Sequence, residues 1–412
     1  MMNLTVDERW DLIGEISSRT VSVGEYREGL KDALAELTVN PWVGIPLAIA
    51  VLYGFWSFFG SFAGFFTDGY MVPIFDEYWT PWLMENFPNP DGWLFKILVG
   101  EYGAGSAMEA FGVLTSGLFV AIGIVLPAIV AFYLFLIVME DLGYLPRLAV
   151  LMDTLLHRIG LHGFAIVPMI LSLGCNVPGV TATRNLTTKK QRFMMMALLS
   201  VFIPCGAQLG VMLVLVPQYA GWIIAFLIAG FFTFGWLLNR LIRGSTPEIL
   251  MDVPPYRMPK LRVVANKLWV RLRGFFTTAI PFVLLGVVVV QILYLTGAMD
   301  SLASFFAPLL TEFFGVPEEA VAPLVAGFLR KDLAIAQLEN IEMSMGQLIT
   351  SIVMISLYFP CLATFIMIMK EGWTEGTKGI VTHLAGSLLV LVAVLFVWTG
   401  VLRLILTLGG IE

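Results

Sequence analysis

The sequence predicts an all-α polytopic membrane protein with about seven full spans and two re-entrant or broken hairpins, arranged as an inverted repeat. Of its 412 residues, 58% are hydrophobic and only 13% are charged, and the mean hydropathy is +0.87. That composition excludes a soluble domain. Long apolar stretches recur along the chain, and several Pro and Gly positions repeat at a nearly constant offset. The sequence pI near 5.3 argues against nucleic acid as a partner.

The first forty residues are polar and amphipathic, and no cleavable signal is apparent in them. We expect 1–40 to form a cytoplasmic arm, as a helix or helix pair against the membrane or a partner. The next unit, 41–110, is predicted to hold a first span at 41–66 and an external loop. That loop, 67–108, carries six acidic residues and a single basic one, Lys96.

The remaining apolar stretches fall into two kinds. The longer stretches predict full spans at 111–139, 193–216, 222–242, 275–295, 348–369 and 380–402. Two stretches, 164–180 and 320–338, are short and cut by Pro and Gly. Irregular backbone is tolerated at membrane depth only where it is buried or lines a cavity. We therefore expect both to be hairpins or broken helices.

Loop charge orients the chain. The segment 239–273 carries eight Lys or Arg, whereas 300–319 carries none. Basic loops remain in the cytoplasm, so the sequence predicts a multi-pass protein of the plasma or inner membrane with a cytoplasmic N-terminus. The segments on either side of the first hairpin are both basic, which a hairpin entering from the cytoplasm satisfies and a full span does not.

An internal repeat relates the two halves at an offset of about 155 residues. The matched features are Leu126-Pro127 with Ile280-Pro281, Gly160 with Gly315, Pro168 with Pro323, and Pro204-Cys205 with Pro360-Cys361. Each half reads as a span, a broken hairpin, a span with a Pro-Cys break, and a span. The halves start from opposite sides, which is a transporter design. The predicted units are repeat 1 at 111–242, a basic cytoplasmic linker at 243–274 and repeat 2 at 275–412.

All three cysteines stand beside helix-breaking residues. They are Cys175 between Gly174 and Asn176, Cys205 after Pro204, and Cys361 after Pro360. Thiolates suit soft or borderline transition metals rather than Mg²⁺ or Ca²⁺, so the pattern favours a metal pathway. A buried Cys is also a common small hydrophobic residue, and that alternative stays open.

Several motifs resemble the membrane domain of the ferrous iron transport protein B (FeoB) family. They are Glu140-Asp141-Leu142-Gly143-Tyr144-Leu145-Pro146-Arg147, Gly174-Cys175-Asn176-Val177-Pro178, and Tyr358-Phe359-Pro360-Cys361-Leu362-Ala363-Thr364. The resemblance covers nearly the whole chain. The family usually carries a GTP-binding domain, and no Gly-x-x-x-x-Gly-Lys-Ser/Thr motif occurs here. The resemblance therefore implies a G protein on a separate chain, together with a small accessory subunit.

The resemblance implies that the chain moves Fe(II) as substrate, with no permanently bound cofactor and no catalytic residues. The expected metal-contacting residues are Cys175, Cys205, Cys361, Asn176 and Asp332. The expected gating or relay residues are Gly174, Pro178, Lys331, Glu140 and Asp141. Asp332 could instead form an interfacial ion pair with Lys331 or Arg330, and Glu140 and Asp141 could be ordinary helix-end residues. Homo-oligomerisation stays open.

Two other functions remain open at this stage. The repeat layout is also similar to the gating domains of nucleoside transporters, which predicts polar sugar-binding side chains at both hairpin tips. The third alternative is a membrane scaffold, which predicts no metal dependence and tolerance of Cys→Ser changes at all three positions.

Overall fold

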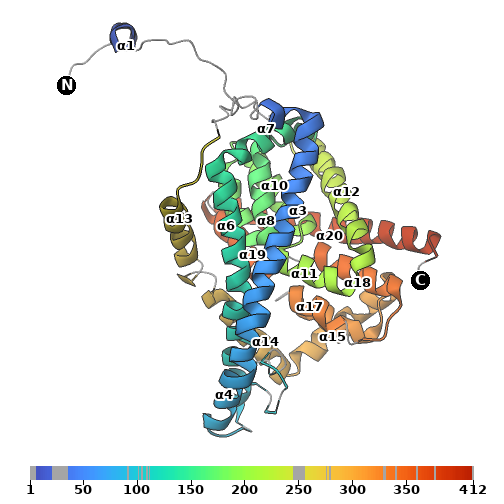
Figure 1. Ribbon diagram of the computed structural model, residues 1–412. Coiled ribbons are helices and arrows are strands. Elements are labelled where there is room, and N and C mark those ends of the chain that lie inside the picture. Colours follow the sequence, from blue (N-terminus) through green and yellow to red (C-terminus); the bar gives the residue numbers. More distant parts are fainter. Residues whose placement is uncertain are drawn as a thin grey trace.

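The computed structural model is helical throughout its described part, with no β-strand there (Figure 1). The described residues are 6–20, 36–90, 92–100, 102–103, 105–107, 110, 112–244, 256–274, 276–277, 280–327, 331–338, 341–358, 361–374 and 377–410. This confirms the predicted all-α class.

The N-terminal part contains one separate helix and one very long one. Helix α1 (Val6–Thr20) stands apart from the helical body. Helix α3 (Pro41–Phe66) begins at Asn40, whose side chain accepts a hydrogen bond from the Trp42 backbone. It then continues through π-helical turns at Thr67–Met71 and Ile74–Trp79 into α4 (Thr80–Asn86). The apolar rod Pro41–Asn86 is 46 residues long, far more than the roughly 20 that cross a bilayer.

The expected loop at 67–108 was therefore wrong over its first twenty residues. Phe75 and Leu83 recur at helical spacing and are buried, Phe75 against Phe119 and Leu83 against Phe95. Burial of this apolar stripe explains why an acidic segment is helical rather than irregular. A short helix, α5 (Trp93–Leu98), completes the packing.

The second long helix leads into repeat 1. π-helical turns at Val113–Gly117 and Phe119–Val125 run directly into α6 (Leu126–Leu142). Gly143 then turns the chain in a left-handed conformation, with φ of 81°. The following helices are α7 (Tyr144–His157), α8 (Ile166–Gly174), α9 (Asn176–Ala182), α10 (Lys189–Phe202), α11 (Gly206–Leu215) and α12 (Pro217–Leu241), with single turns at Gly163–Ala165 and Thr183–Asn185.

The linker and repeat 2 follow. Helix α13 (Leu261–Gly274) is the basic segment between the repeats. The next helices are α14 (Ile280–Leu295), α15 (Ala298–Pro308), α16 (Val321–Ala326), α17 (Lys331–Gln337), α18 (Met345–Leu357), α19 (Leu362–Thr374) and α20 (Thr377–Leu408). Short turns occupy Leu309–Phe313 and Glu318–Ala320.

The two halves match element by element at the offset seen in the sequence. Helices α9 and α17 start at 176 and 331, which are 155 residues apart, and both contain seven residues. Helices α10 and α18 are capped in the same way, by Thr188 and by Ser344. Gly160 and Gly315 both adopt a left-handed conformation, with φ of 77° and 71°, which favours glycine at both positions.

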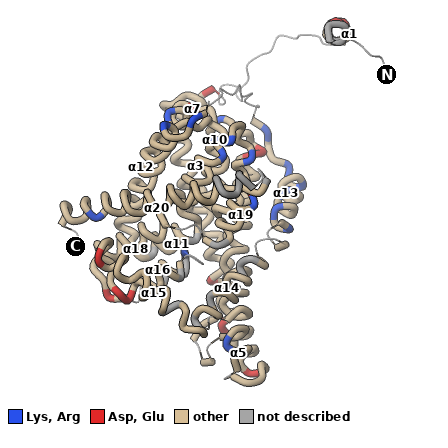
Figure 2. The backbone as a smooth tube through the Cα atoms, turned by 180° about the vertical axis from the view of Figure 1, so that it is seen from behind, with Lys and Arg blue, Asp and Glu red and all other residues tan. Residues whose placement is uncertain are grey.

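The halves point in opposite directions. Helices α7 and α10 lie toward one end of the molecule, and α15 and α17 lie toward the other (Figure 1). Figure 2 shows Lys and Arg gathered around α7, α10 and α13, and Asp and Glu gathered at the turns beside α15. The charge separation follows the inside–outside pattern expected of a membrane protein.

Four helices in the described part are long and apolar enough to cross a bilayer: Pro41–Asn86, Val113–Leu142, Pro217–Leu241 and His383–Leu408. These correspond to four of the seven predicted spans. The predicted spans 193–216 and 348–369 are each split in two, at the expected Pro-Cys breaks. The predicted span 275–295 is helical from Ile280, as α14, with 16 residues.

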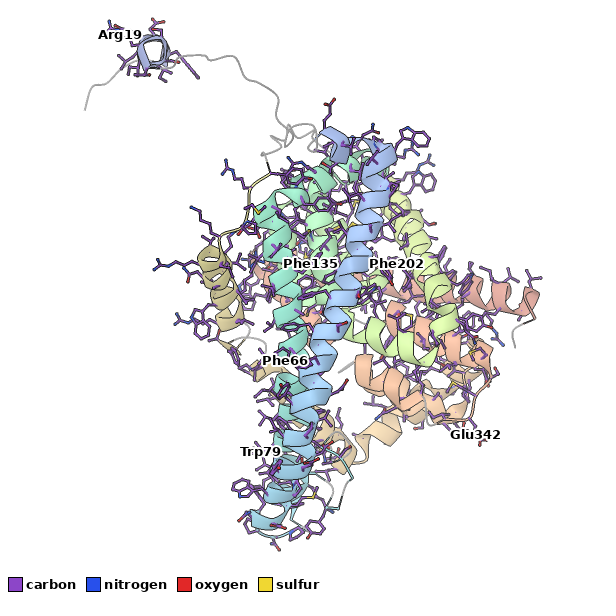
Figure 3. All side chains as sticks on the ribbon, in the orientation of Figure 1. Arg19, Phe66, Trp79, Phe135, Phe202 and Glu342 are labelled. Atoms are coloured by element: carbon purple, nitrogen blue, oxygen red, sulfur yellow. The ribbon has the colours of Figure 1, made fainter. Side chains whose placement is uncertain are left out.

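The core lies where the repeats meet. One large apolar cluster joins α10 and α12 to α18 and α20, and includes Phe202, Phe234 and Ile352. Aromatic rings attach α3 to α6: Phe55 and Phe135 have ring centroids 4.7 Å apart. Figure 3 shows Phe135 and Phe202 on either side of α3.

Candidate functional site

The first hairpin folds back on itself at Cys175. Cys175 is extended, with φ of −155° and ψ of 135°, so it interrupts the helix between α8 and α9. Gly179 of α9 lies so close to α8 that an added Cβ would come within 1.8 Å of the Ser172 hydroxyl oxygen. Only glycine permits this approach, and the predicted broken hairpin is confirmed.

The second hairpin uses the same close approach with the two residue types exchanged. Gly327 and Ala334 lie 155 residues after Ser172 and Gly179. A Cβ built on Gly327 would come within 2.8 Å of the Ala334 Cβ. One residue of each crossing pair must therefore be glycine, and each repeat satisfies this in its own way.

All three cysteines stand at the start of a half-helix. Cys175 and Cys205 are the N-terminal caps of α9 and α11. The Cys361 carbonyl accepts the first helical hydrogen bond of α19, from the Phe365 backbone at 3.0 Å. Helix N-termini carry partial positive charge, which stabilises a nearby thiolate. None of the three cysteines is in a disulfide, and each is partly accessible to solvent.

The breaks from the two repeats meet in the middle of the protein. Helix α9 packs against α19, and α11 packs against α17, so each half-helix contacts the opposite repeat. Cys175 lies within electrostatic range of both Cys361 and Cys205. A side chain built on Gly206 would come within 3.3 Å of the Gly174 carbonyl. The structure therefore brings all three predicted cysteines to one region.

Two equivalent residues bind the backbone where a half-helix ends. Asn176 donates from Nδ2 to the Ile203 carbonyl at 3.3 Å, just past α10. Lys331 donates from Nζ to the Tyr358 carbonyl at 3.3 Å, just past α18. Both the donors and the acceptors are 155 residues apart. The repeats thus share one contact, made by a neutral amide in repeat 1 and an ammonium in repeat 2.

The two donors differ in what they leave unsatisfied. Lys331 is 5% exposed and makes a further hydrogen bond to the Ser356 carbonyl at 2.9 Å. Asn176 is 7% exposed, and its Oδ1 has no hydrogen-bond partner in the described part of the protein. A buried amide oxygen without a donor is unfavourable, and a cation would satisfy it.

Two further polar residues of the site, Gln208 and Thr364, were missed by sequence reasoning. Gln208 of α11 donates to the Ser356 hydroxyl of α18 at 2.8 Å, across the repeats. Thr364 is fully buried, and its hydroxyl lies 3.1 Å from the Cys361 sulfur. Each stands three residues after a cysteine, which is one helical turn, and that spacing is the signal that could have found them.

An ion pair joins the repeats on the basic side of the site. Arg184 Nε lies 2.6 Å from Glu371 Oε2, and the Glu371 side chain is 5% exposed. This contact with α19 links the end of the first hairpin to repeat 2.

The remaining predicted residues fall in different places. Gly174 is the last residue of α8 and lies close to the Phe132 ring. Pro178 is the third residue of α9. Glu140 and Asp141 lie at the end of α6 and pair with Lys267 and Arg271 of α13.

Asp332 follows Lys331 in α17; its side chain lies outside the described residues, as does the whole of Arg330. Within the described part, no three His, Cys, Asp or Glu side chains are close enough together to hold a metal ion jointly.

The site thus offers dispersed soft and hard donors rather than a closed metal cage. Thiols from both repeats and the Asn176 amide oxygen lie at these breaks. Such donors suit a borderline cation that moves from ligand to ligand.

Comparison with known proteins gives two family matches. Residues 122–218 and 276–374 match the family described as "Gate: Nucleoside recognition", once in each repeat. Residues 221–271 match the family described as "Ferrous iron transport protein B C terminus".

Among curated proteins, the Fe(2+) transporter FeoB of Staphylococcus aureus is 28% identical over 63% of this chain and 45% of its own. The Fe(2+) transporter FeoB of Legionella pneumophila is 25% identical over 83% of this chain and 47% of its own. A Porphyromonas gingivalis fusion of Fe(2+) transport protein A with Fe(2+) transporter FeoB is 29% identical over 71% and 34%. The chain spans about half or less of the length of these relatives. No solved structure matches it.

Proposed function

Because the chain belongs to the family of FeoB membrane domains, we propose that it carries ferrous iron across the plasma or inner membrane, as a permease. The proposed arrangement has a cytoplasmic N-terminus and two gate repeats, 111–242 and 275–412, joined by the linker 243–274. The chain itself is a transporter rather than an enzyme, and Fe(II) is its substrate.

The convergence of cysteines from both repeats at three helix breaks is the observation that carries this proposal. Fe(II) must lose water molecules to enter an apolar layer, and protein ligands lower that free-energy barrier. Cys175 and Asn176 supply a thiol and an unsatisfied amide oxygen from repeat 1. Cys361 supplies a thiol from repeat 2. A metal close to these thiols favours their deprotonation.

The ligands act in succession rather than together. No three carboxylate, imidazole or thiol side chains of the described residues lie close enough together to hold one metal ion jointly, so no described position traps the ion in a complete protein shell. Conduction needs binding that is strong enough for entry and weak enough for release. Cys205, at the start of α11, and Asp332, next to Lys331, complete the proposed series of ligands.

Lys331 provides the opposing electrostatic effect. Its buried ammonium lies within electrostatic range of Cys361 and Cys205 and is held on two carbonyls of the α18 end. A fixed positive charge repels an entering cation and also pairs with a thiolate when iron is absent. We assign to Lys331 the role of a gate, with Gly174 and Pro178 shaping the opposite break.

These 412 residues contain no phosphate-binding motif, so nucleotide hydrolysis is assigned to a G protein outside this stretch of sequence. The name of the Porphyromonas relative joins Fe(2+) transport protein A to the transporter, which supports a small accessory subunit as a second partner. We propose that Glu140 and Asp141, which α13 holds in place at the end of α6, act as gating or relay residues.

Uptake of Fe(II) into proteoliposomes under anaerobic conditions tests the proposal. The wild type is compared with Cys175→Ser, Cys205→Ser and Cys361→Ser, each verified as folded by its elution profile. Mn(II) tests metal selectivity. We expect Fe(II) flux in the wild type and a loss of at least tenfold in the Cys175 and Cys361 variants, since a hydroxyl is a much poorer ligand for a borderline metal.

Uridine serves as the competing substrate, because the matching family is described by nucleoside recognition and because Asn176 and Gln208 are buried amides in the centre. Uridine flux without Fe(II) flux would replace the iron proposal with nucleoside transport. Undiminished Fe(II) flux in all three cysteine variants would overturn the thiol pathway while leaving iron as the substrate.

A further inference from the structure

Helix α13 is fixed to the protein along one face. Lys267 Nζ lies 2.5 Å from Asp141 Oδ1, and Arg271 lies 2.8 Å from Glu140 Oε2. These contacts are one helical turn apart, and Val264 on the same face is buried. Just before the helix, Tyr256 stacks under the Arg147 guanidinium at 3.8 Å. The helix therefore has a defined orientation against α6.

The opposite face of α13 is both basic and apolar. Trp269 is 66% exposed and Val270 is 70% exposed. Arg262 and Arg273 are also exposed on this helix. The exposed side chains Arg257 and Lys260 precede it. None of these four cations forms a salt bridge within the described part of the chain.

The position of α13 relates this face to the membrane surface. The helix ends at Gly274, and the apolar helix α14 begins at Ile280. Figure 2 shows α13 among the Lys and Arg residues that gather toward one end of the molecule. It contacts the end of α6, where Glu140 and Asp141 mark the limit of the apolar segment. The helix runs alongside the end of α6 (Figure 1), with Lys267 at Asp141 and Arg271 over the Tyr133 ring, so its outward face extends across the level of the lipid headgroups.

We propose that the outward face of α13 is a binding site for anionic phospholipid headgroups of the cytoplasmic leaflet. Arg262 and Arg273 contact phosphate oxygens, with Arg257 and Lys260 extending the basic surface. Trp269 and Val270 insert between acyl chains at the interface. Charge complementarity selects this occupant: the chain as a whole is acidic, with a net charge of −6, but this face presents only cations.

The inward contacts make the site more than a general anchor. Lys267 and Arg271 neutralise Glu140 and Asp141 and hold the helix in register. Arg262 and Arg273 therefore face outward together, eleven positions apart, which is close to three helical turns. The surface is preorganised for phosphates because the helix cannot rotate without breaking both ion pairs.

The test uses the full chain in nanodiscs of phosphatidylcholine that contain a rising fraction of brominated phosphatidylglycerol. Bromine quenches tryptophan at short range, and Trp269→Phe, which removes an exposed indole, isolates the Trp269 signal by difference. The variant is Arg262→Gln with Arg273→Gln. The matched control is Arg158→Gln with Arg243→Gln, which removes two exposed cations elsewhere at the basic end.

We expect half-maximal quenching of Trp269 at a low fraction of the anionic lipid. The α13 variant should need a higher fraction, by about 25-fold if each of the two charges contributes about fivefold, and the control should match the wild type. High salt should weaken the wild-type preference.

Equal quenching by brominated phosphatidylcholine and brominated phosphatidylglycerol would show that Trp269 is inserted in the bilayer but that the helix does not distinguish the headgroups, and this would overturn the proposal. An equal loss in both double variants would also overturn it, because the effect would then reflect total charge. Displacement of the lipid by inorganic phosphate at equal ionic strength would assign the site to a soluble anion instead. Fe(II) flux is not needed for any of these outcomes.

Discussion

The close crossing of α8 and α9 makes a specific prediction about Gly179. In Gly179→Ala, the new methyl group would lie 1.8 Å from the Ser172 hydroxyl oxygen and 3.0 Å from the Pro168 carbonyl oxygen. Overpacking of this kind destabilises by about 1–3 kcal/mol. Replacing glycine within a helix returns about 0.5–1 kcal/mol. We expect a net loss of about 1–2 kcal/mol in unfolding free energy, because the clash outweighs the backbone gain.

The second hairpin supplies the rescue. There the equivalent pair is Gly327 and Ala334, so Ser172→Gly combined with Gly179→Ala copies an arrangement that the protein already contains. The Ser172 hydroxyl is buried and has no hydrogen-bond partner among the described residues, so its removal breaks no contact seen there. The double variant should be more stable than Gly179→Ala alone, although Ser172→Gly by itself is mildly destabilising.

Thermal unfolding in detergent, followed by the static light scattering of each purified variant, measures both effects. The four proteins form a double-mutant cycle, in which the coupling between the two sites should be at least about 1 kcal/mol. A Gly179→Ala protein as stable as the wild type would refute the tight hairpin. Additive effects would show that the two residues do not touch.

Three other expectations follow from the site. Arg184→Ala and Glu371→Gln should be non-additive in a double-mutant cycle of unfolding free energy, with a coupling of about 1–2 kcal/mol because one partner is buried. Additive effects would show that this ion pair does not couple the two repeats. Lys331→Gln removes a central positive charge while keeping a donor for the α18 carbonyls, so the apparent KM for Fe(II) uptake should fall severalfold; an unchanged KM would exclude Lys331 as a barrier. Burial lowers the pKa of His162 below its ordinary value of 6.5, so stability should decrease as the pH falls from about 7 to about 5, and His162→Gln should flatten that melting-temperature profile; equal slopes would refute the assignment.

Much of the fold followed from local rules. The Pro and Gly breaks at Cys175, Cys205 and Cys361 predicted where helices end, because these residues disrupt helical geometry wherever they occur. The constant offset predicted that α9 corresponds to α17, and α10 to α18, in the two repeats. Such features depend on sequence spacing alone, so they could be read without coordinates.

Other features depended on packing that spacing does not reveal. The helix at 67–86 looked like a loop because of its acids, but its apolar stripe has a partner in 113–125 that only the tertiary structure supplies. Glu140 and Asp141 were grouped with the metal path by resemblance, and the structure pairs them with α13. Lys331 was considered as an ion-pair partner of Asp332 because the two are adjacent in sequence. Its ammonium instead donates to the Ser356 and Tyr358 carbonyls at the end of α18.

The central claim is that thiols from both repeats contact iron, and protection from alkylation tests it most directly. The folded protein is treated anaerobically with a small thiol reagent, with Fe(II), with Mg(II) or with no added metal, and the rate at each cysteine is read by mass spectrometry. This readout requires neither a G protein nor transport. The account predicts that Fe(II) slows alkylation of Cys175 and Cys361 severalfold and that Mg(II) does not, because thiolates prefer the softer ion. Equal rates with Fe(II), with Mg(II) and without metal at both positions would contradict it.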